Sequence, residues 1–230
     1  IHLEIIKKCR EEVGNDFAIS IKMNSADFQK GGFSPEDSIQ VAKLFSDSGI
    51  DNIEISGGTY EQPRLLGLDK VSINPKRSEN RKESTIAREA YFLSYAEEIA
   101  KVVNIPLMVT GGFRTKEGME AALADGACEI VGVGRPLCAN PYAIKELLAG
   151  QIDELPKYEK SLSIGPWWLS PTSPFRLIQA INAFSAQAWF YQQIKKMGKG
   201  LMPDLYLKPW KAFREDAKAD QEAIKEYQNF

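Results

Sequence analysis

The sequence predicts an α/β fold built on a parallel sheet, and more narrowly one half of a TIM (β/α)8 barrel. Two apolar runs support this prediction: residues 105–110 and 129–133 are short, rich in Val, Ile and Leu, and each ends at glycine. A strand buried on both faces of a parallel sheet has this pattern, because neither face alternates with polar residues. The helical segment 115–126 separates the two runs, as in a βαβ unit.

Helices and strands alternate throughout the first part of the chain. Apolar spacing and terminal glycines predict helices in five segments, which are 1–13, 34–48, 87–103, 116–125 and 140–148. Short apolar runs predict four strands, which are 17–23, 51–56, 105–110 and 129–133. Strands joined by helices run parallel, so four such units give either one open sheet or half of an eightfold barrel.

Two glycine motifs follow the third and fourth predicted strands. They are Gly111-Gly112 and the stretch from Gly132 to Arg135. Parallel strands end at one edge of a sheet, where glycine lets a ligand approach the backbone and arginine offers a planar cation to phosphate oxygens. In a TIM barrel, the loops after strands 7 and 8 form the common phosphate site. We therefore interpret these strands as strands 7 and 8, which leaves strands 1–4 outside this chain.

Lys22 lies near the carboxyl end of the first predicted strand, among apolar neighbours. A lysine in that position is either a surface group whose stem lies along apolar residues or a cation that points into the mouth of a barrel. The position alone leaves both interpretations open.

The stretch 57–86 is long, polar and basic, and it follows the carboxyl end of the second predicted strand. Loops of this length are usually functional lids or disordered segments. A solvated excursion is one interpretation. The other is a lid, because the stretch begins on the face where the active sites of barrels form.

Composition restricts the broad class of protein. With 43% hydrophobic residues the 230-residue chain can bury a core, and its net charge of −2 argues against a general nucleic-acid binder. No apolar run approaches the roughly 18 residues of a membrane span. Three widely spaced cysteines, Cys9, Cys128 and Cys138, indicate neither a disulfide framework nor a zinc site, so we expect no metal and a cytoplasmic protein. The chain begins at Ile1 without a methionine, which leaves room for a targeting segment ahead of it.

Residues 151–230 are predicted to form a helical extension to a barrel half in residues 1–150. Residues 151–172 are rich in proline, serine and tryptophan and indicate an irregular crossing. A helix is expected from Ser173-Pro174 to Met197. Its apolar stripe predicts core or a subunit interface and consists of Leu177, Ile181, Phe184, Ala188, Tyr191 and Ile194. The charged segment from Pro209 predicts a solvated surface helix.

Four motifs follow one another at sensible spacing: Lys22-Met-Asn-Ser-Ala-Asp-Phe28, Glu54-Ile-Ser-Gly-Gly-Thr-Tyr-Glu61, Val109-Thr-Gly-Gly-Phe-Arg114 and Gly132-Val-Gly-Arg-Pro136. The glycine motifs alone are common among phosphate-binding barrels, but the ordered set is specific. Over residues 1–150 the chain resembles the Old Yellow Enzyme family, and more narrowly its fungal and bacterial branch of NADH:flavin oxidoreductases. The resemblance implies an FMN-containing TIM barrel that takes a hydride from NAD(P)H and passes it to an activated alkene.

The resemblance also implies cofactor-binding roles for five residues. Lys22 matches the basic residue at the end of strand 5 that contacts the flavin N1/O2 edge, where a cation stabilises the negative charge of the reduced ring. Gly111 and Gly112 match the strand-7 glycine turn at the FMN phosphate. Gly134 and Arg135 match the strand-8 pair at the same phosphate.

No catalytic residue is identified in this chain. In the family, the histidine pair or His/Asn pair that anchors the substrate and the tyrosine that protonates it come from the first half of the barrel. Tyr60 and Tyr91 lie in the wrong elements to replace that tyrosine. The resemblance also places Phe113 near the flavin edge. No Cys-x2-Cys series follows the last strand, so the chain does not resemble the iron–sulfur dienoyl-CoA reductase branch.

The resulting hypothesis is the C-terminal portion of an FMN-dependent, ene-reductase-like enzyme that uses NAD(P)H to reduce a small activated alkene. A half barrel exposes two sheet edges, so we expect the missing N-terminal half or another copy of the chain to close it. We also expect a homo-oligomer formed through the extension, and neither a nucleic-acid nor a membrane partner. Two alternatives stay open. One is a non-catalytic barrel half that acts as a binding or scaffolding unit, and the other is a phosphate-ligand aldolase or isomerase that uses Lys22 for a Schiff base.

Overall fold

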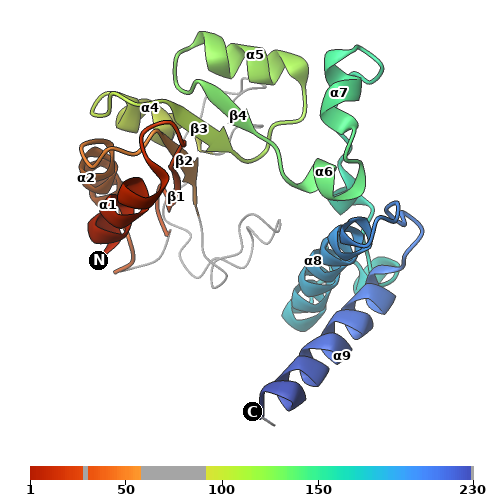
Figure 1. The fold of residues 1–230 in the computed structure, drawn as a ribbon. Coiled ribbons are helices and arrows are strands. Elements are labelled where there is room, and N and C mark those ends of the chain that lie inside the picture. The colour runs from red at the N-terminus through yellow and green to blue at the C-terminus, as the bar shows by residue number, and fades with distance from the viewer. Residues whose placement is uncertain (28–30, 58–91, 229–230) are drawn as a thin grey trace. The chain divides into compact units, whose positions relative to one another are not determined.

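The computed structural model describes residues 1–27, 31–57 and 92–228, and the chain forms two compact units (Figure 1). The first unit is Ile1–Gly134 and the second is Arg135–Phe230. Each unit has its own cluster of buried hydrophobic residues.

The first unit is built on a four-stranded parallel sheet. Its strands follow one another in space in the order of the sequence, β1 (Ser20–Asn24), β2 (Asn52–Ser56), β3 (Leu107–Thr110) and β4 (Ile130–Gly132). Sequential order of parallel strands, each separated from the next by a helical connection, is the arrangement in a TIM barrel. The four predicted strands are confirmed, each shorter than its apolar run.

Helices accompany these strands as the alternating pattern predicts. They are α1 (His2–Val13), α2 (Pro35–Ser46), α4 (Leu93–Ala100) and α5 (Lys116–Ala124). The start of α2 is fixed by a capping box, in which the Ser34 hydroxyl accepts from the Asp37 amide and the Asp37 carboxylate accepts from the Ser34 amide. Helix α2 packs on β2 and α4, α4 packs on β3, and α5 packs on β4.

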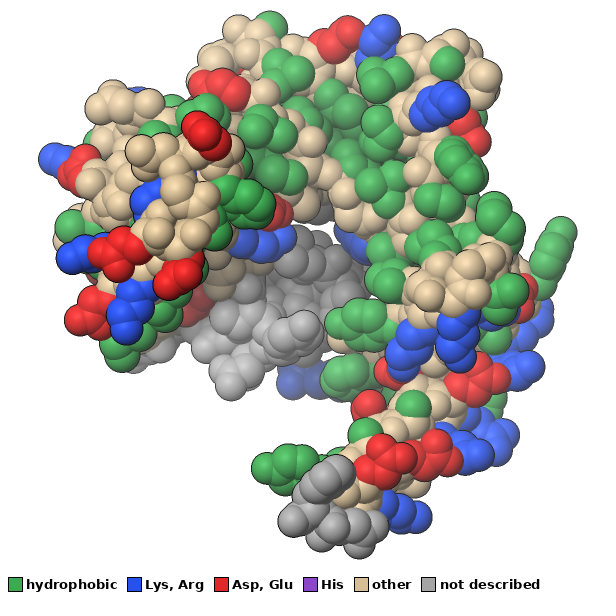
Figure 2. Space-filling view, in the orientation of Figure 1, with side chains coloured by type: hydrophobic (Ala, Val, Ile, Leu, Met, Phe, Trp, Pro, Cys, Tyr) green, Lys and Arg blue, Asp and Glu red, His purple; other side chains and the backbone are tan. Residues whose placement is uncertain are grey.

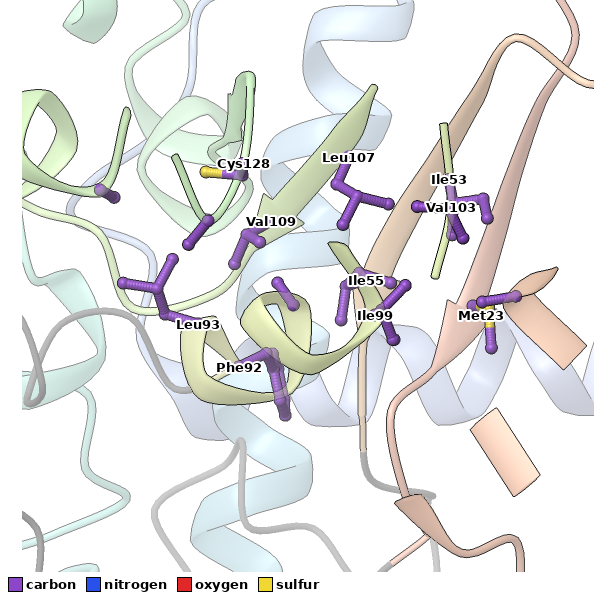
Figure 3. Packing of buried hydrophobic residues seen from close by; sticks show 14 of the residues in the cluster. Met23, Ile53, Ile55, Phe92, Leu93, Ile99, Val103, Leu107, Val109 and Cys128 are labelled. Carbon is purple, nitrogen blue, oxygen red and sulfur yellow. The ribbon is translucent and has the colours of Figure 1, made fainter. Parts of the chain in front are cut away.

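The core of the first unit lies on one face of the sheet. The central side chains of this core are those of Ile53, Ile55, Leu107 and Val109, and each is 0–1% exposed. Figure 3 shows these residues with Ile99 of α4, which belongs to the same cluster. Side chains alternate between the faces of a strand, so the intervening residues of each strand project from the opposite face.

The second unit is helical. Its elements are α6 (Arg135–Ala139), α7 (Ala143–Leu148), the short 3-10 turns η3 (Tyr158–Lys160) and η4 (Trp167–Leu169), α8 (Arg176–Gly198) and α9 (Pro209–Gln228). Helix α6 packs on α8, and α8 packs along α9. The compact units therefore divide after Gly134, earlier than the boundary expected after residue 150. That boundary, which separates barrel from extension, stays a prediction.

The apolar stripe predicted for α8 differs from the face that the structure buries. Leu177 and Phe184 are 71% and 57% exposed, whereas Trp189 and Gln193 are at most 1% exposed. The reason is hydrogen bonding: the Trp189 indole N–H donates to the Leu207 carbonyl at 2.9 Å, and the Gln193 side-chain oxygen accepts from the Asp204 amide at 2.6 Å. Polar partners on the following segment thus turn this side of α8 inward.

Helix α9 is the surface helix that the charge pattern predicts. Figure 2 shows acidic and basic side chains along it, and two of its ion pairs, Lys211–Glu215 and Lys218–Glu222, join residues four apart. Such exposed pairs stabilise a helix by a few tenths of a kcal/mol each, about 0.3–0.5. Across the described residues, none of the helices is both long and apolar enough to cross a bilayer.

Candidate functional site

The carboxyl ends of β3 and β4 lie side by side. Thr110 at the end of β3 is in register with Gly132 at the end of β4. Gly111 and Gly112 follow directly, with φ of 140° and 86°, values that favour glycine because a Cβ is disfavoured there. The predicted neighbourhood of the two strand ends is therefore confirmed at Thr110 and Gly132, and Gly111 and Gly112 are both partly exposed.

Gly132 is required by the side chains of the neighbouring strand. A Cβ built on Gly132 would lie 1.8 Å from the Thr110 Oγ1 and 2.7 Å from the Met108 Cε. The Thr110 side chain thus occupies the place that a side chain at 132 would need. Sequence reasoning assigned Gly132 to ligand approach, whereas the structure gives it a packing role at the edge of the sheet.

The hydroxyl of Thr110 was missed by sequence reasoning. Its Oγ1 is buried and finds no hydrogen-bond partner among the described residues. A buried hydroxyl without a partner is uncommon in a folded protein and is most often satisfied by a ligand or by water. Its place directly before Gly111 in the third motif is the signal that points to it.

Lys22 projects from the face of the sheet opposite the hydrophobic core. Its Nζ lies 2.6 Å from the Oε1 of Glu54, and the two residues are register partners on β1 and β2. The Lys22 side chain is 55% exposed and the Glu54 side chain 20%. The structure therefore gives Lys22 a partner that sequence reasoning did not name, although Glu54 begins the second motif.

The ion pair belongs to a row of four residues that runs across the whole sheet. In register, Lys22 is beside Glu54, Glu54 beside Met108, and Met108 beside Ile130. Two residues nearer the carboxyl edge, on the same face, Asn24 is the register partner of Ser56, and Thr110 is the register partner of Gly132. In a closed barrel this face is the interior, because the helices cover the other one.

Arg135 begins α6 and therefore the second compact unit. Its guanidinium Nη1 lies 3.7 Å from the Oε1 of Glu159, and the two side chains are 31% and 26% exposed. The residues predicted to hold the phosphate are thus divided between the units: Gly111, Gly112 and Gly134 belong to the first unit and Arg135 to the second. Arg135 was expected in a loop, and the short α6 was not predicted.

Phe113 is a core residue. Its side chain is 1% exposed and belongs to the hydrophobic cluster of the first unit, whereas the resemblance placed it near a flavin edge. Tyr60, Tyr91 and residues 58–86 of the expected basic loop lie outside the described residues.

The thiols offer no nucleophile at this site. Burial raises the pKa of both Cys128 and Cys138, so both stay protonated at neutral pH. Within the described ranges, no group of three or more His, Cys, Asp or Glu side chains is arranged to hold a metal ion.

These residues fit an anionic ligand that also needs hydrogen-bond partners, as FMN does. Lys22 supplies an ammonium group with three donors, and Thr110 supplies a buried hydroxyl without a partner among the described residues. The turn at Gly111-Gly112 lies at the carboxyl edge, both glycines are partly exposed, and neither carries a side chain that would keep a ligand from the backbone. The donor set is suited to binding and to charge stabilisation rather than to covalent catalysis.

The first two thirds of the chain match a known protein family. Residues 1–154 match the NADH:flavin oxidoreductase / NADH oxidase family. The chain is 38% identical over 151 residues to an NADH-dependent flavin oxidoreductase of Hypocrea jecorina, a match that covers 64% of this chain and 35% of that protein. It is 33% identical over 195 residues to an NADH oxidase of Thermoanaerobacter brockii, covering 84% of this chain and 27% of that protein. This chain thus spans about a third of the length of these relatives.

The structure resembles that of a 2-naphthoyl-CoA reductase bound to 2-naphthoyl-CoA. The TM-score is 0.53 at 26% sequence identity, over 66% of this chain and 22% of that one. The parallel sheet and its helices therefore form part of an α/β barrel, as predicted. The resemblance found from the four motifs is confirmed by the family match. The chain belongs to the NADH:flavin oxidoreductase / NADH oxidase family, a family of enzymes that use FMN and a nicotinamide reductant.

Proposed function

We propose that this chain carries the FMN phosphate site and the flavin-edge cation of an oxidoreductase that uses NAD(P)H to reduce activated alkenes. The observation that supports this most is the shared edge and face of the sheet. Lys22 projects from the face that becomes the barrel interior, and the Gly111-Gly112 turn ends β3 at the carboxyl edge. Active sites of TIM barrels form at this edge.

The residues of this chain bind and stabilise charge. When bound, FMN supplies the transfer of a hydride from NAD(P)H to the alkene. Lys22 holds a positive charge against the ring edge where negative charge develops, which is the electrostatic contribution that a protein makes to a flavin. The backbone at Gly111, Gly112 and Gly134, with the guanidinium of Arg135, would hold the phosphate.

Substrate activation belongs to groups outside this chain. The resemblance assigns the proton-donating tyrosine and the pair of substrate-anchoring side chains to the first half of the barrel, and residues 1–150 resemble the second half. We propose that the substrate-activating groups come from the remaining half of the barrel, which the rest of the polypeptide or another copy supplies. We also propose a cytoplasmic location and self-association through the extension. Activated alkenes are the proposed substrates because their electron-poor carbon accepts a hydride.

The test is a visible absorption spectrum of the purified complete protein before and after anaerobic addition of NADPH or NADH. A flavin band that bleaches, and returns when an α,β-unsaturated carbonyl compound is added, supports the proposal. A band that bleaches but returns only when oxygen is admitted supports FMN as the cofactor and refutes activated alkenes as the substrates. A protein that stays colourless after incubation with FMN refutes the proposal as a whole.

The Schiff-base alternative is tested with the same preparation. Lysines that form Schiff bases are desolvated or lie beside another cation, whereas the Lys22 side chain is 55% exposed and paired with Glu54. Borohydride reduction in the presence of a carbonyl substrate should therefore leave no adduct on Lys22. A peptide bearing the adduct would favour the aldolase or isomerase.

A further inference from the structure

We propose that Glu54 is a positioning residue for Lys22, and that its carboxylate sets how tightly the site holds reduced flavin relative to oxidised flavin. This inference rests on the proposed function, since it concerns the cation assigned to the flavin edge. It assigns a role to Glu54, whose negative charge is opposite to the positive charge that a site for reduced flavin requires.

The contact itself is short and is specified by the sheet. The Nζ of Lys22 lies 2.6 Å from the Oε1 of Glu54, within hydrogen-bond distance. The two residues occupy the same register position on adjacent parallel strands, so their side chains leave the same face side by side. A shift of either strand by one residue would turn one of them to the other face.

Glu54 is the more rigid member of the pair. It is flanked along β2 by Ile53 and Ile55, which are both 0% exposed and anchor the strand in the core. Its side chain is 20% exposed, whereas the longer Lys22 side chain is 55% exposed. A flexible lysine held by a fixed carboxylate takes its position from that carboxylate.

The surroundings leave Glu54 with one cationic neighbour in its row. Its register partners are Lys22 on β1 and Met108 on β3, and Met108 is followed by Ile130 on β4. An apolar side chain neither competes for the carboxylate nor offsets its charge. The pair is therefore the charged element of this row, with apolar side chains filling the rest.

Stability is a poor explanation for this pair. Ion pairs with one exposed partner contribute little to folding, because solvent screens them and the lysine loses side-chain entropy. When the barrel closes over this face and excludes water, the same charges act much more strongly on any ligand beside them. The arrangement is consequently better explained by what the pair does to a bound cofactor.

The sign of the effect follows from charge. Two-electron reduction of the flavin brings negative charge to the ring edge, which Lys22 attracts and Glu54 repels. Replacing the carboxylate by an amide keeps an acceptor for Lys22 but removes the repulsion. Glu54→Gln should therefore favour the reduced flavin by about tenfold, which is a rise of about 30 mV in the two-electron midpoint potential.

The experiment measures the midpoint potential and the dissociation constant of FMN in the complete, FMN-loaded protein and in its variants. Glu54→Gln should show the higher potential, and Glu54→Asp, which keeps the charge, should return most of the way to the wild-type value. The matched control is Glu98→Gln, because Glu98 forms a Lys–Glu pair of the same 2.6 Å length with Lys101 on the surface of α4. Its potential should equal that of the wild type.

A merely structural role for Glu54 would leave the potential unchanged. Glu54→Gln with bound FMN and a wild-type potential therefore overturns the inference while leaving the proposed function intact. A wild-type protein that binds no FMN overturns both. The two failures are distinguished by the colour of the wild-type protein alone.

If Glu54→Gln does not retain FMN, a second comparison tests whether the Glu54 charge acts on the flavin. Lys22→Gln leaves the carboxylate facing the flavin without its cation, and Lys22→Gln/Glu54→Gln removes that carboxylate. The double variant should then hold reduced flavin about tenfold more tightly, relative to oxidised flavin, than Lys22→Gln does. Equal ratios in the two proteins would show that the Glu54 charge does not reach the cofactor.

Discussion

At the scale of single residues, the carboxyl edge of the sheet depends on the absence of one side chain. Gly132 lies under the Thr110 side chain, with its would-be Cβ 1.8 Å from Oγ1. The Thr110 Cβ would also lie only 2.8 Å from that would-be Cβ, so a side chain at 132 requires the Thr110 side chain to move. The Thr110 Oγ1 is buried there and finds no hydrogen-bond partner among the described residues.

Gly132→Ala should destabilise the protein by about 1–3 kcal/mol, because the added methyl group overlaps the Thr110 side chain. Urea unfolding measures this free energy. The control is Gly134→Ala in the same connection, since a Cβ there meets nothing within 4 Å. Equal stability of the two variants would show that the Thr110 side chain rotates away freely.

Asp51 and Arg10 form a second important contact, at the amino end of the sheet. The Asp51 carboxylate accepts from the Ile19 amide at 2.7 Å and pairs with the Arg10 guanidinium. That guanidinium also donates to three backbone carbonyls, those of Gly14, Phe17 and Gly49. The hydrogen bond from Ile19, followed by that from Arg10, lowers the pKa of Asp51 below its ordinary value.

This lowered pKa predicts a loss of stability in acid. A carboxyl group whose pKa is lower in the folded state contributes stability above its unfolded pKa of about 4, and that contribution disappears as the pH falls through the folded pKa. Asp51→Asn should therefore be less stable than the wild type at neutral pH and lose less stability on acidification.

Urea unfolding at about pH 5 and about pH 3 measures the difference. Asp125→Asn, which removes an exposed carboxylate at the end of α5, is the control and should retain the wild-type pH dependence. If Asp51→Asn loses as much stability between these pH values as the wild type does, the contacts of Asp51 with Ile19 and Arg10 do not form in solution.

At the scale of elements, α8 shows how partners decide which face of a helix is buried. Its inward face carries Asn182, Ser185 and Gln193 beside Trp189, and its hydrogen bonds reach the segments before and after it. Of the predicted apolar stripe, Ala188 is buried, whereas Leu177, Phe184, Tyr191 and Ile194 are exposed. The proposal that this stripe is a subunit interface is untested.

Trp189 is the main anchor of this helix. It is 1% exposed, stacks edge-on against Phe190 with ring centroids 5.1 Å apart, and donates to the Leu207 carbonyl. Trp189→Ala should cost about 3–5 kcal/mol through the cavity that it leaves.

The matched control for this cavity is Trp167→Ala in the same unit. The side chain of Trp167 is 87% exposed, so its removal should change stability by no more than about 0.5 kcal/mol. Thermal unfolding followed by near-ultraviolet circular dichroism compares the two variants. Similar losses in both would place the Trp189 ring outside a packed core.

At the scale of the whole molecule, the open sheet is the feature that must be completed. Strands β1 and β4 each have one neighbouring strand in the described sheet, and the row from Lys22 to Ile130 lies on the face opposite the core. Unpaired strand edges promote association with other chains. A closed barrel removes both edges.

The chain on its own should therefore associate as its concentration rises. Sedimentation velocity over a range of concentrations measures this, and Ile130→Lys, which puts a charge on the edge strand β4, should reduce the association. Ile130 is 42% exposed, so the lysine can reach water and the fold should tolerate it. A monomer at every concentration, with or without the substitution, would show that these edges are already protected.

Much of the fold and part of the candidate site could be predicted from sequence. The strands ending at Thr110 and Gly132 were predictable because their apolar runs stop at glycine, and the start of α2 because Ser34, Pro35 and Asp37 form a local capping signal. Leu44 on α2 is apolar and yet 54% exposed, because the periodicity that predicts a helix does not show where its buried face ends. The roles of Lys22 and of the glycines toward FMN stay predictions.

The parallel strands, their order and the family are predictable from the sequence, because each depends on local apolar runs and ordered motifs. Three features follow only from the packed fold: Glu54 holds Lys22, Thr110 covers Gly132, and the buried face of α8 carries Trp189 and Gln193. The reason is physical: residues that are 32 positions apart, or that lie on different strands, become neighbours through sheet register, and register is set by the packing of the whole sheet on its helices.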